Sequence, residues 1–225
     1  MTAKEQYEQV AAELAEVCRA CGRDPREVVL VAVSKTVGPD AVAAAMQGGA
    51  LDFGENRPDQ LMLKADAFPQ VRWHFIGNIQ SRRIRDIVGR AVLIHSLFDA
   101  GHAAKIDREA AARGIVQDVL LEANVSGEES KSGVSPDQAS ELLRACGELE
   151  HVRVRGLMTM APIGSAQVAR ATFDGLAQLH AQLKATLDGE AAAAFTELSM
   201  GMTDDWREAI AAGATIVRIG RAIFA

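Results

Sequence analysis

Eight short apolar runs alternate with helix-like segments along this chain, and that alternation constrains its fold more than any other feature. The first run, Val28–Val33, reads VVLVAV, a continuous β-branched stretch of the kind buried on both faces of a parallel sheet. Most intervening segments begin at Pro, Ser, Thr or Asp and end at Gly, which are helix start and stop signals. Four further strand-like runs span Val71–Ile76, Val92–Leu97, Val116–Asn124 and Val152–Met158, and the remaining three end at Asn56, Ser199 and Arg218. Strands that alternate with helices predict a parallel sheet covered by helices.

Eight such units in 225 residues predict one closed (β/α)8 TIM barrel, an α/β fold, spanning residues 1–225 as a single domain. Apolar residues at helical spacing over residues 3–20 predict an extra N-terminal helix ahead of the first strand. Hydrophobic residues make up 48% of the chain and aromatics only 4%, an aliphatic composition that suits helices packed on a parallel sheet. An open doubly wound sheet is the alternative architecture.

Charge and hydropathy exclude several classes of partner. The net charge of −6, with no long basic run, argues against a nucleic-acid surface. No stretch approaches the roughly 20 apolar residues that a membrane span needs, and the polar start MTAKEQYEQV does not resemble a signal peptide. Cys18, Cys21 and Cys146 are an odd set. Cys18 and Cys21 form a C-x-x-C, but no second pair or histidine lies near it in the sequence, so we expect reduced thiols, a cytoplasmic protein and no metal site, with a zinc or redox role as the alternative.

The C-terminal stretch Thr196–Phe224 reads as strand, helix, strand, with the helix running from Thr203 to Gly213, and a long amphipathic helix is expected before it from about Ala166 to Leu187. Small or basic residues stand at both strand ends. Ser199, Met200 and Gly201 end the first of these strands, and Arg218 to Arg221 end the second. Loops at the carboxyl ends of neighbouring parallel strands expose backbone N–H groups, which suit a phosphate dianion. The two strand ends therefore predict one phosphate site, and ordinary βα turns are the alternative.

Lys35 follows the first buried strand and is the candidate nucleophile. In a barrel all strand ends open on the same face, so the residues at those ends should gather at one mouth: Lys35, Asn56, Asn78, Ser96, Asn124, Met158, Ser199 and Arg218. A lysine opposite a phosphate site suggests capture of a phosphorylated carbonyl compound as a Schiff base. Burial among apolar strand ends would favour the neutral, reactive amine. A barrel enzyme acting on a sugar phosphate, or a lysine that only extends to solvent, remains open at this point.

Eight ordered motifs then resemble those of the pyridoxal phosphate homeostasis protein family, which is similar to the N-terminal barrel of bacterial alanine racemase. They are VAVSKT (31–36), FGEN (53–56), WHFIGNIQS (73–81), HSLF (95–98), NVSGEESKSG (124–133), GLMTM (156–160), ELSMGM (197–202) and VRIGRAIF (217–224). The resemblance implies a protein of intracellular vitamin B6 homeostasis that holds pyridoxal 5′-phosphate (PLP) covalently at Lys35 and buffers it or delivers it to apoenzymes.

The resemblance also assigns roles to other residues. Ser199 and the backbone amides that follow it, through Met200 to Gly201, would hold the phosphate with the amides of Gly220 and Arg221. Arg218 would face the pyridine nitrogen, and Asn56 would lie near the phenolic oxygen. The family usually has Thr at position 221, so a hydroxyl contact is lost here, although the arginine offers an amide and a charge-assisted bond instead. Ala225 stands where Gly is common.

An arginine at the ring nitrogen donates a hydrogen bond but leaves the ring uncharged, and an uncharged ring is a weak electron sink. In the alanine racemase family a tyrosine from a second domain supplies the second base, whereas the one tyrosine here, Tyr7, lies in the N-terminal helix. We therefore expect cofactor binding without turnover and a monomer, and a PLP-dependent amino-acid racemase is the alternative. His74 and His95 are expected to be hydrogen-bonded core residues, and the polar loop 128–133 a solvated loop, with a lid or partner site as its alternative.

Overall fold

The structure, a computed structural model, describes residues 1–128 and 132–225, and its eight strands pair in chain order into a closed barrel. Every pairing is parallel, and β1 closes the barrel against β8 with Leu30 opposite Val217. The strands are β1 (Val29–Val33), β2 (Asp52–Glu55), β3 (Arg72–Phe75), β4 (Leu93–Leu97), β5 (Gln117–Glu122), β6 (Val152–Met158), β7 (Glu197–Ser199) and β8 (Ile216–Ile219). The predicted (β/α)8 barrel is therefore confirmed, and the open sheet is excluded.

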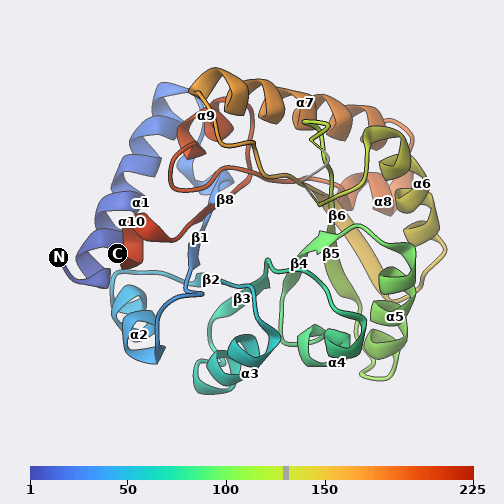
Figure 1. Ribbon diagram of the computed structural model, residues 1–225, viewed down its shortest axis with the longest axis horizontal. Coiled ribbons are helices and arrows are strands. Elements are labelled where there is room, and N and C mark those ends of the chain that lie inside the picture. Colours follow the sequence, from blue (N-terminus) through green and yellow to red (C-terminus); the bar gives the residue numbers. More distant parts are fainter. Residues whose placement is uncertain (129–131) are drawn as a thin grey trace.

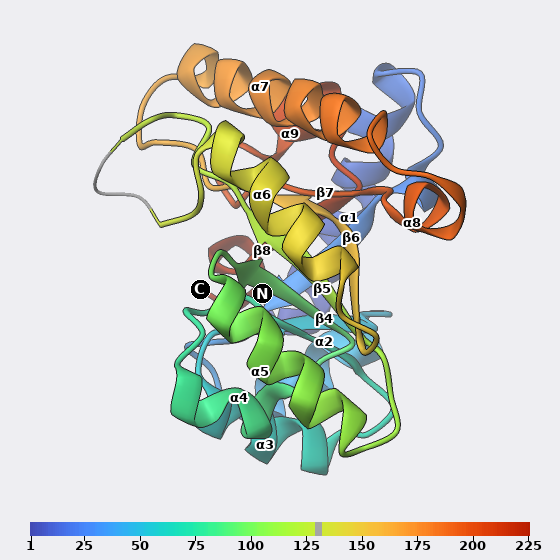
Figure 2. The same cartoon turned by 90° about the vertical axis from the view of Figure 1, so that its right-hand side faces the viewer.

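Helices surround the strands (Figure 1). They are α1 (Ala3–Ala20), α2 (Pro39–Gln47), α3 (Pro58–Ala67), α4 (Ile84–Ile87), α5 (Ala100–Ala111), α6 (Pro136–Gly147), α7 (Ala166–Lys184), α8 (Gly189–Ala194), α9 (Trp206–Ala211) and α10 (Arg221–Phe224), with 3-10 turns at Pro25–Glu27 and Ser81–Arg83. The helix α1 is the predicted extra helix, and it lies beside α10 so that the two ends of the chain are close together. Seen from the side, α5 and α6 lie against each other along one flank of the barrel (Figure 2).

Local chemistry explains where most helices begin. Thr2 and Ser135 form capping boxes at the starts of α1 and α6, and Asp99 caps α5 by accepting from the amide of His102. Each of these side chains satisfies an amide that has no acceptor inside the helix. Proline occupies the first turn of α2, α3 and α6, where its missing N–H costs nothing.

Two apolar layers hold the barrel together. The larger lies between the strands and the helices, and the smaller fills the barrel with Val31, Leu93, Leu120, Met158 and Ile216, which come from five different strands. Side chains alternate between these layers along each strand, because successive residues of a strand point to opposite faces. Among the described residues, no helix is long and apolar enough to span a membrane.

The structure differs from the sequence-based prediction in three segments. The helix predicted from Thr203 begins at Trp206, because residues 202–205 form a turn in which the carboxylate of Asp205 accepts from the amide of Met202. The long helix predicted to reach Leu187 ends at Lys184, and α8 follows it. The four-residue helix α10 was not predicted, since so short a segment shows no apolar period. Of the loop 128–133, residues 129–131 lie outside the described residues.

Candidate functional site

A cavity of about 620 Å³ opens at the carboxyl ends of the strands, and we call it the mouth cavity. Its wall is made by loops that follow β1, β2, β3, β6, β7 and β8: Val33, Lys35, Thr36, Asn56, Ile76, Gly77, Asn78, Met158, Met160, Met202, Thr203, Asp204, Arg218, Gly220 and Arg221. This volume lies within the range of about 300–1,000 Å³ typical of small-molecule sites. Polar groups scattered along the sequence thus meet in one place, as the barrel topology predicts.

The mouth cavity receives Lys35 from the turn directly after β1. The preceding residue, Ser34, is fully buried and held at three atoms: its amide donates to the carbonyl of Gly54 (3.0 Å), its hydroxyl donates to Glu55 Oε1 (2.6 Å), and its carbonyl accepts from Lys64 Nζ (2.8 Å). The backbone that carries Lys35 is therefore rigid. Lys35 itself is exposed, so the expectation that apolar strand ends would bury its amine is wrong.

A buried ion pair stands behind Ser34. Lys64 Nζ lies 2.5 Å from Glu55 Oε1, and the two side chains are only 1% and 0% exposed. Burying two charges is costly unless each is paired and hydrogen-bonded, and Lys64 meets that condition by bonding both Glu55 and the carbonyl of Ser34. Lys64 lies on α3, and no local sequence pattern predicted that its side chain would be buried.

Arg218 lies on β8, the strand paired with β1, and its side chain lines the mouth cavity and is almost fully buried. Its Nη1 donates to Ser199 Oγ and its Nη2 donates to the carbonyl of Thr159 (2.9 Å), which orients the guanidinium. Burial lowers the pKa of Arg218 to about 10, while the nearby carboxyls of Asp205 and Glu122 oppose that shift. The side chain consequently remains a cation and a hydrogen-bond donor at neutral pH.

The loop after β7 and the start of α10, which follows β8, are neighbours at the cavity, because β7 and β8 are paired strands. Arg221 and Asp204 form an ion pair between these two segments, and both side chains are largely exposed. Gly201 has a φ of +91° and a Cβ there would lie 2.6 Å from Ala209 Cβ, so only glycine permits this turn. The first amides of α10 have no acceptor inside the helix, because the first turn of any helix leaves its N–H groups free.

Five of the eight predicted binding residues line the mouth cavity: Lys35, Asn56, Arg218, Gly220 and Arg221. The other three, Ser199, Met200 and Gly201, are buried and do not line it. The hydroxyl of Ser199 is engaged with Arg218 and with His95 Nδ1 (2.9 Å), and the amide of Met200 donates to the carbonyl of Ile216. The residues that face the cavity from this loop are instead the next three along the chain, Met202, Thr203 and Asp204.

The close approach of Gly77 to the backbone of Asn56 was missed by sequence reasoning, whereas the two buried histidines were expected. Gly77 lines the cavity so close to the backbone of Asn56 that an added Cβ would lie 2.0 Å from the Asn56 carbonyl oxygen. The dipeptide Gly77-Asn78 at a strand end was the only signal for it. His74 and His95 are buried and hydrogen-bonded to each other at 2.9 Å, as expected of core residues.

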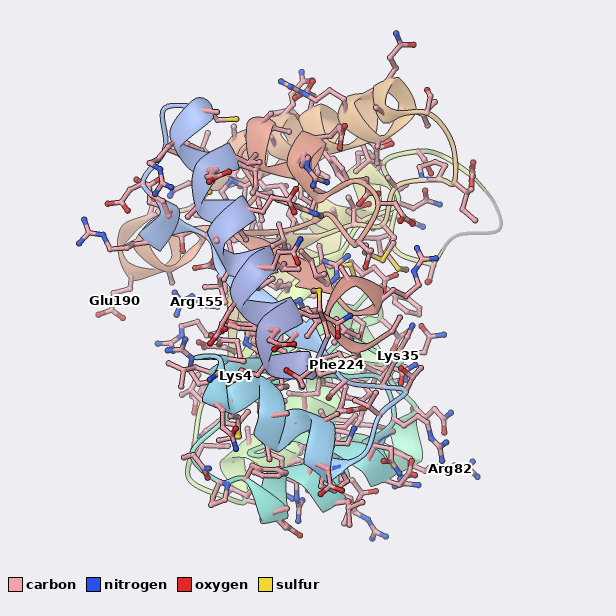
Figure 3. All side chains as sticks on the ribbon, turned by 90° about the vertical axis from the view of Figure 1, so that its left-hand side faces the viewer. Lys4, Lys35, Arg82, Arg155, Glu190 and Phe224 are labelled. Atoms are coloured by element: carbon pink, nitrogen blue, oxygen red, sulfur yellow. The ribbon has the colours of Figure 1, made fainter. Side chains whose placement is uncertain are left out.

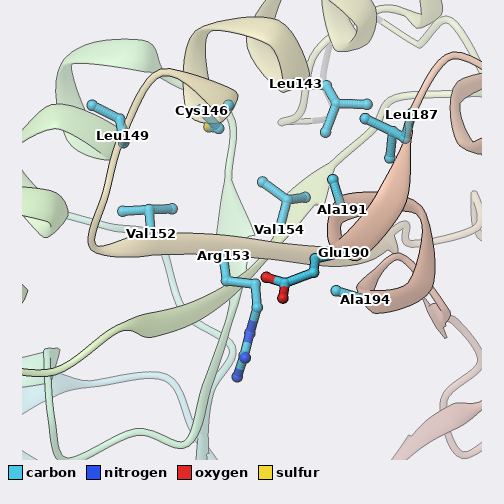
Figure 4. A pocket seen from close by; sticks show the side chains of 11 residues that line it. Leu143, Cys146, Leu149, Val152, Arg153, Val154, Leu187, Glu190, Ala191 and Ala194 are labelled. Carbon is cyan, nitrogen blue, oxygen red and sulfur yellow. The ribbon is translucent and has the colours of Figure 1, made fainter.

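A second cavity of about 230 Å³ lies away from the mouth, between β6, α6 and α8 (Figure 4). Apolar side chains such as Leu143, Val154 and Leu187 dominate its lining. Cys146 is buried here, and burial raises the pKa of its thiol to about 12. Glu190, from this cavity, and Lys35 lie on opposite sides of the molecule (Figure 3). The thiol is unreactive at neutral pH, so this cavity offers no comparable chemistry.

The charges around the mouth cavity favour an anionic carbonyl compound. Lys35, Arg218 and Arg221 contribute three cations to the wall, whereas Asp204 contributes its one carboxylate. This excess of positive charge occurs in a chain whose net charge is −6, so it is local to the site. A primary amine at the rim, a buried cation in the wall and free amides suit a ligand with an aldehyde, a ring and a phosphate.

The chain is similar to known proteins over almost its whole length. Residues 6–225 match the family model "Alanine racemase, N-terminal domain". The chain is 38% identical to the pyridoxal phosphate homeostasis protein of Aquifex aeolicus, over 100% of this chain and 98% of that protein. It is 39% identical to the protein of the same name from Pseudomonas aeruginosa, over 99% and 95% of the two chains. Among solved structures, PipY of Synechococcus elongatus with PLP bound superposes with a TM-score of 0.81 at 32% identity, covering 94% of this chain and 100% of that one.

Proposed function

The chain belongs to the alanine racemase N-terminal domain family and to the pyridoxal phosphate homeostasis proteins within it, and from that membership we propose that it binds PLP in the mouth cavity. Its role would be to keep the free aldehyde low in the cell and to pass the cofactor to apoenzymes. The observation that carries the proposal is the presence of Lys35, Arg218 and Gly220 in the wall of one cavity. When bound, PLP supplies a reactive aldehyde and an electron-withdrawing ring.

Lys35 is the residue we assign to covalent attachment. Its Nζ would form a C=N bond with the aldehyde carbon, and the aldehyde oxygen would leave as water. Lys35 is exposed at the rim, while the buried contacts of Ser34 fix the backbone beneath it. An exposed amine on a rigid base suits reversible loading, because the cofactor can reach and leave the lysine without rearrangement of the barrel.

The remaining groups would orient the cofactor. The amides at the start of α10, with Gly220 and Arg221, face the loop Met202–Asp204 and would hold the phosphate between them. Arg218 would donate to the ring nitrogen, and Asn56 would lie at the phenolic oxygen. These assignments move the phosphate contacts from Ser199 and Met200 to the residues that follow them. The Ser199 hydroxyl already accepts from Arg218, and the Met200 amide already donates to the carbonyl of Ile216.

We further propose that binding is not followed by efficient turnover. Arg218 stays protonated at neutral pH and therefore cannot protonate the ring nitrogen fully, which keeps the ring a weak electron sink. Tyr7 lies on the buried face of α1 and does not line the mouth cavity, so it cannot act as a second base there. The expected protein is a carrier, monomeric and cytoplasmic, and its free cysteines support a reducing compartment. A weak racemase activity is compatible with the same site.

The test is the visible absorbance of PLP titrated into the purified protein. Wild type should develop the absorbance band of lysine-bound PLP, and Lys35→Ala should not. Lys4→Ala, which removes an exposed lysine from α1, is the matched control and should behave as wild type. A Lys35→Ala protein that keeps the full band would refute attachment at Lys35. Conversion of alanine enantiomers at ordinary enzymatic rates would refute the carrier role and favour the racemase.

A further inference from the structure

An unbroken line of hydrogen-bonded side chains crosses the interior of the barrel and ends at Arg218. It begins near the amino ends of the strands, where the carboxylate of Asp52 accepts from Arg72 Nε (2.7 Å) and lies 3.1 Å from His74 Nε2. His74 Nδ1 is 2.9 Å from His95 Nε2. His95 Nδ1 is in turn 2.9 Å from Ser199 Oγ, which accepts from Arg218 Nη1. The line thus joins β2, β3, β4, β7 and β8.

These side chains are shielded from solvent. Asp52 is 7% exposed, His74 and Arg218 are 5% exposed, and His95 and Ser199 are 0% exposed. Buried polar groups must find partners inside the protein, because an unsatisfied buried group destabilises the fold. Because bulk water does not reach these side chains, the loss of one bond between them would leave a buried polar atom without a partner.

The two ends of the line fix the direction of every bond in it. Arginine can only donate, so Ser199 Oγ must accept from Arg218. An ionised carboxylate can only accept, and the pKa of Asp52 stays below its usual value: burial raises it, but His74 and Arg72 outweigh that effect. His74 must therefore carry its proton on Nε2.

Only one arrangement of protons places a donor opposite an acceptor in each bond between His74, His95 and Ser199. With Nε2 of His74 protonated, its Nδ1 is an acceptor, so His95 must donate from Nε2. Nδ1 of His95 is then an acceptor, and it takes the hydroxyl proton of Ser199. Both histidines are neutral and both are Nε2–H tautomers. Every proton points from Arg218 toward Asp52.

An additional proton on either imidazole would break this arrangement. A doubly protonated His95 or His74 turns His95 Nδ1 into a donor, and the hydroxyl hydrogen of Ser199 then loses its acceptor in a buried site. The surrounding charges oppose such a proton at His95, whose pKa is lowered by burial and by its neighbours His74 and Arg218. Around the ends of the line, Glu122 and Asp205 face Arg218, while Tyr7 faces Asp52.

We propose that Ser199, His95 and His74 are positioning residues that form a one-way hydrogen-bond relay anchored on Asp52, and that this relay holds the guanidinium of Arg218 against the mouth cavity. The bond from Arg218 Nη2 to the carbonyl of Thr159 (2.9 Å) supplies the second anchor. Nη1 and Nη2 of Arg218 are thereby fixed, and the guanidinium N–H groups that these two bonds do not use can face a ligand. The role of Arg218 toward PLP rests on the proposed function, whereas the relay itself is a property of the cofactor-free chain.

The relay is tested first without cofactor. Long-range ¹H–¹⁵N correlation spectra of the purified, cofactor-free protein at pH 7 report the tautomer of each histidine. We expect His74 and His95 as neutral Nε2–H tautomers. An Nδ1–H tautomer or an imidazolium at either residue overturns the relay.

The coupling between its members is tested by substitution. In His74→Phe the acceptor for His95 Nε2–H is gone, so the His95 signals should change from one tautomer to a mixture, and the Kd for PLP should rise about tenfold. His151→Phe, a histidine outside the relay, is the control and should leave His95 and the Kd unchanged. An unchanged His95 tautomer in His74→Phe contradicts the relay.

A second variant covers the case in which His74→Phe does not fold. His95→Gln keeps a donor near the former Nε2 position but removes the acceptor for Ser199, so the affinity for PLP should again fall about tenfold. Affinity equal to wild type contradicts the positioning role. A wild-type protein that shows the expected tautomers but binds no PLP would refute the proposed function and leave the relay standing.

Discussion

Replacing Lys64 with methionine should destabilise the barrel far more than the loss of an ordinary ion pair. Methionine keeps most of the length and apolar volume of lysine but removes the ammonium that lies 2.5 Å from Glu55 Oε1. Both side chains are at most 1% exposed, so the remaining carboxylate cannot be reached by water. Breaking one partner of a buried pair typically costs about 3–5 kcal/mol, because an uncompensated charge stays in the interior.

The local contacts raise that estimate. Lys64 also donates to the carbonyl of Ser34 at 2.8 Å, and an unsatisfied buried acceptor adds about 1–3 kcal/mol. Glu55 Oε1 keeps only the hydroxyl of Ser34, and its Oε2 has no partner among the described residues. The two costs together give about 4–8 kcal/mol, and we expect Lys64→Met to lose about 4–6 kcal/mol of unfolding free energy, the lower half of that range.

Urea unfolding followed by circular dichroism measures the effect. With a slope of about 3 kcal/mol/M, the midpoint should fall by roughly 1–2 M. The matched control is Lys4→Met, which breaks the surface pair Lys4–Glu8 at 3.9 Å, where both side chains are about half exposed. That control should change stability by less than about 0.5 kcal/mol.

A double-mutant cycle with Glu55→Gln separates the pair from the loss of either side chain alone. The double variant should lose less than the sum of the two single variants, because the second substitution removes the stranded charge. A Lys64→Met protein within about 1 kcal/mol of wild type would refute the reasoning, since it would mean that the charge of Glu55 is not confined to the interior.

Three further outcomes follow from the structure. Gly77→Ala should weaken PLP binding and lower the unfolding midpoint, because its Cβ would lie 2.0 Å from the Asn56 carbonyl oxygen; titration and urea unfolding measure the two effects. Arg221→Ala should raise the Kd for PLP about threefold to tenfold, and more at low salt than at high salt, while leaving stability nearly unchanged because its pair with Asp204 is exposed. His180 should make the fold acid-sensitive: burial lowers its pKa to about 4, so its stabilisation is complete above the unfolded value near 6.5 and is lost as the pH falls toward 4. Discounted for its partial exposure this amounts to about 1–2 kcal/mol, so the loss of stability between pH 7 and 4, measured from urea midpoints, should be smaller by that amount in His180→Gln than in wild type.

The order of the elements could be read from the sequence because each strand and each long helix carries its own local signal. Val29–Val33 is a β-branched run, and α6 begins at a Ser-Pro pair and ends at Gly147. Such signals depend on a few neighbouring residues. The short helix α10 and the turn before α9 depend instead on where β8 and β7 place the chain, and no local pattern reports that.

The site was predicted less completely, because the sequence alone does not show which residues of each strand point into the barrel and which point toward the helices. Which side of a strand faces the barrel interior is set by the pairing register of the closed barrel, and Ser199 pairs with Ile216 in that register. Its hydroxyl consequently faces inward to His95, although the sequence around it is typical of a phosphate loop. Nothing in the spacing of His74 and His95 shows that they meet, because they lie on separate strands.

The two walls of the mouth cavity are supported in different ways, and this difference has a consequence for a carrier. Lys35 stands on a backbone fixed by the buried pair Glu55–Lys64, and Arg218 is held by Ser199 and Thr159. The loop that we propose would face the phosphate is instead tied to α10 by the exposed pair of Asp204 with Arg221. Exposed pairs contribute at most about 1 kcal/mol, so an arriving phosphate can displace Asp204 from Arg221 at little cost. Rigid support under the ring and the lysine, with a weakly held contact at the phosphate, would allow a site to select its ligand and still release it.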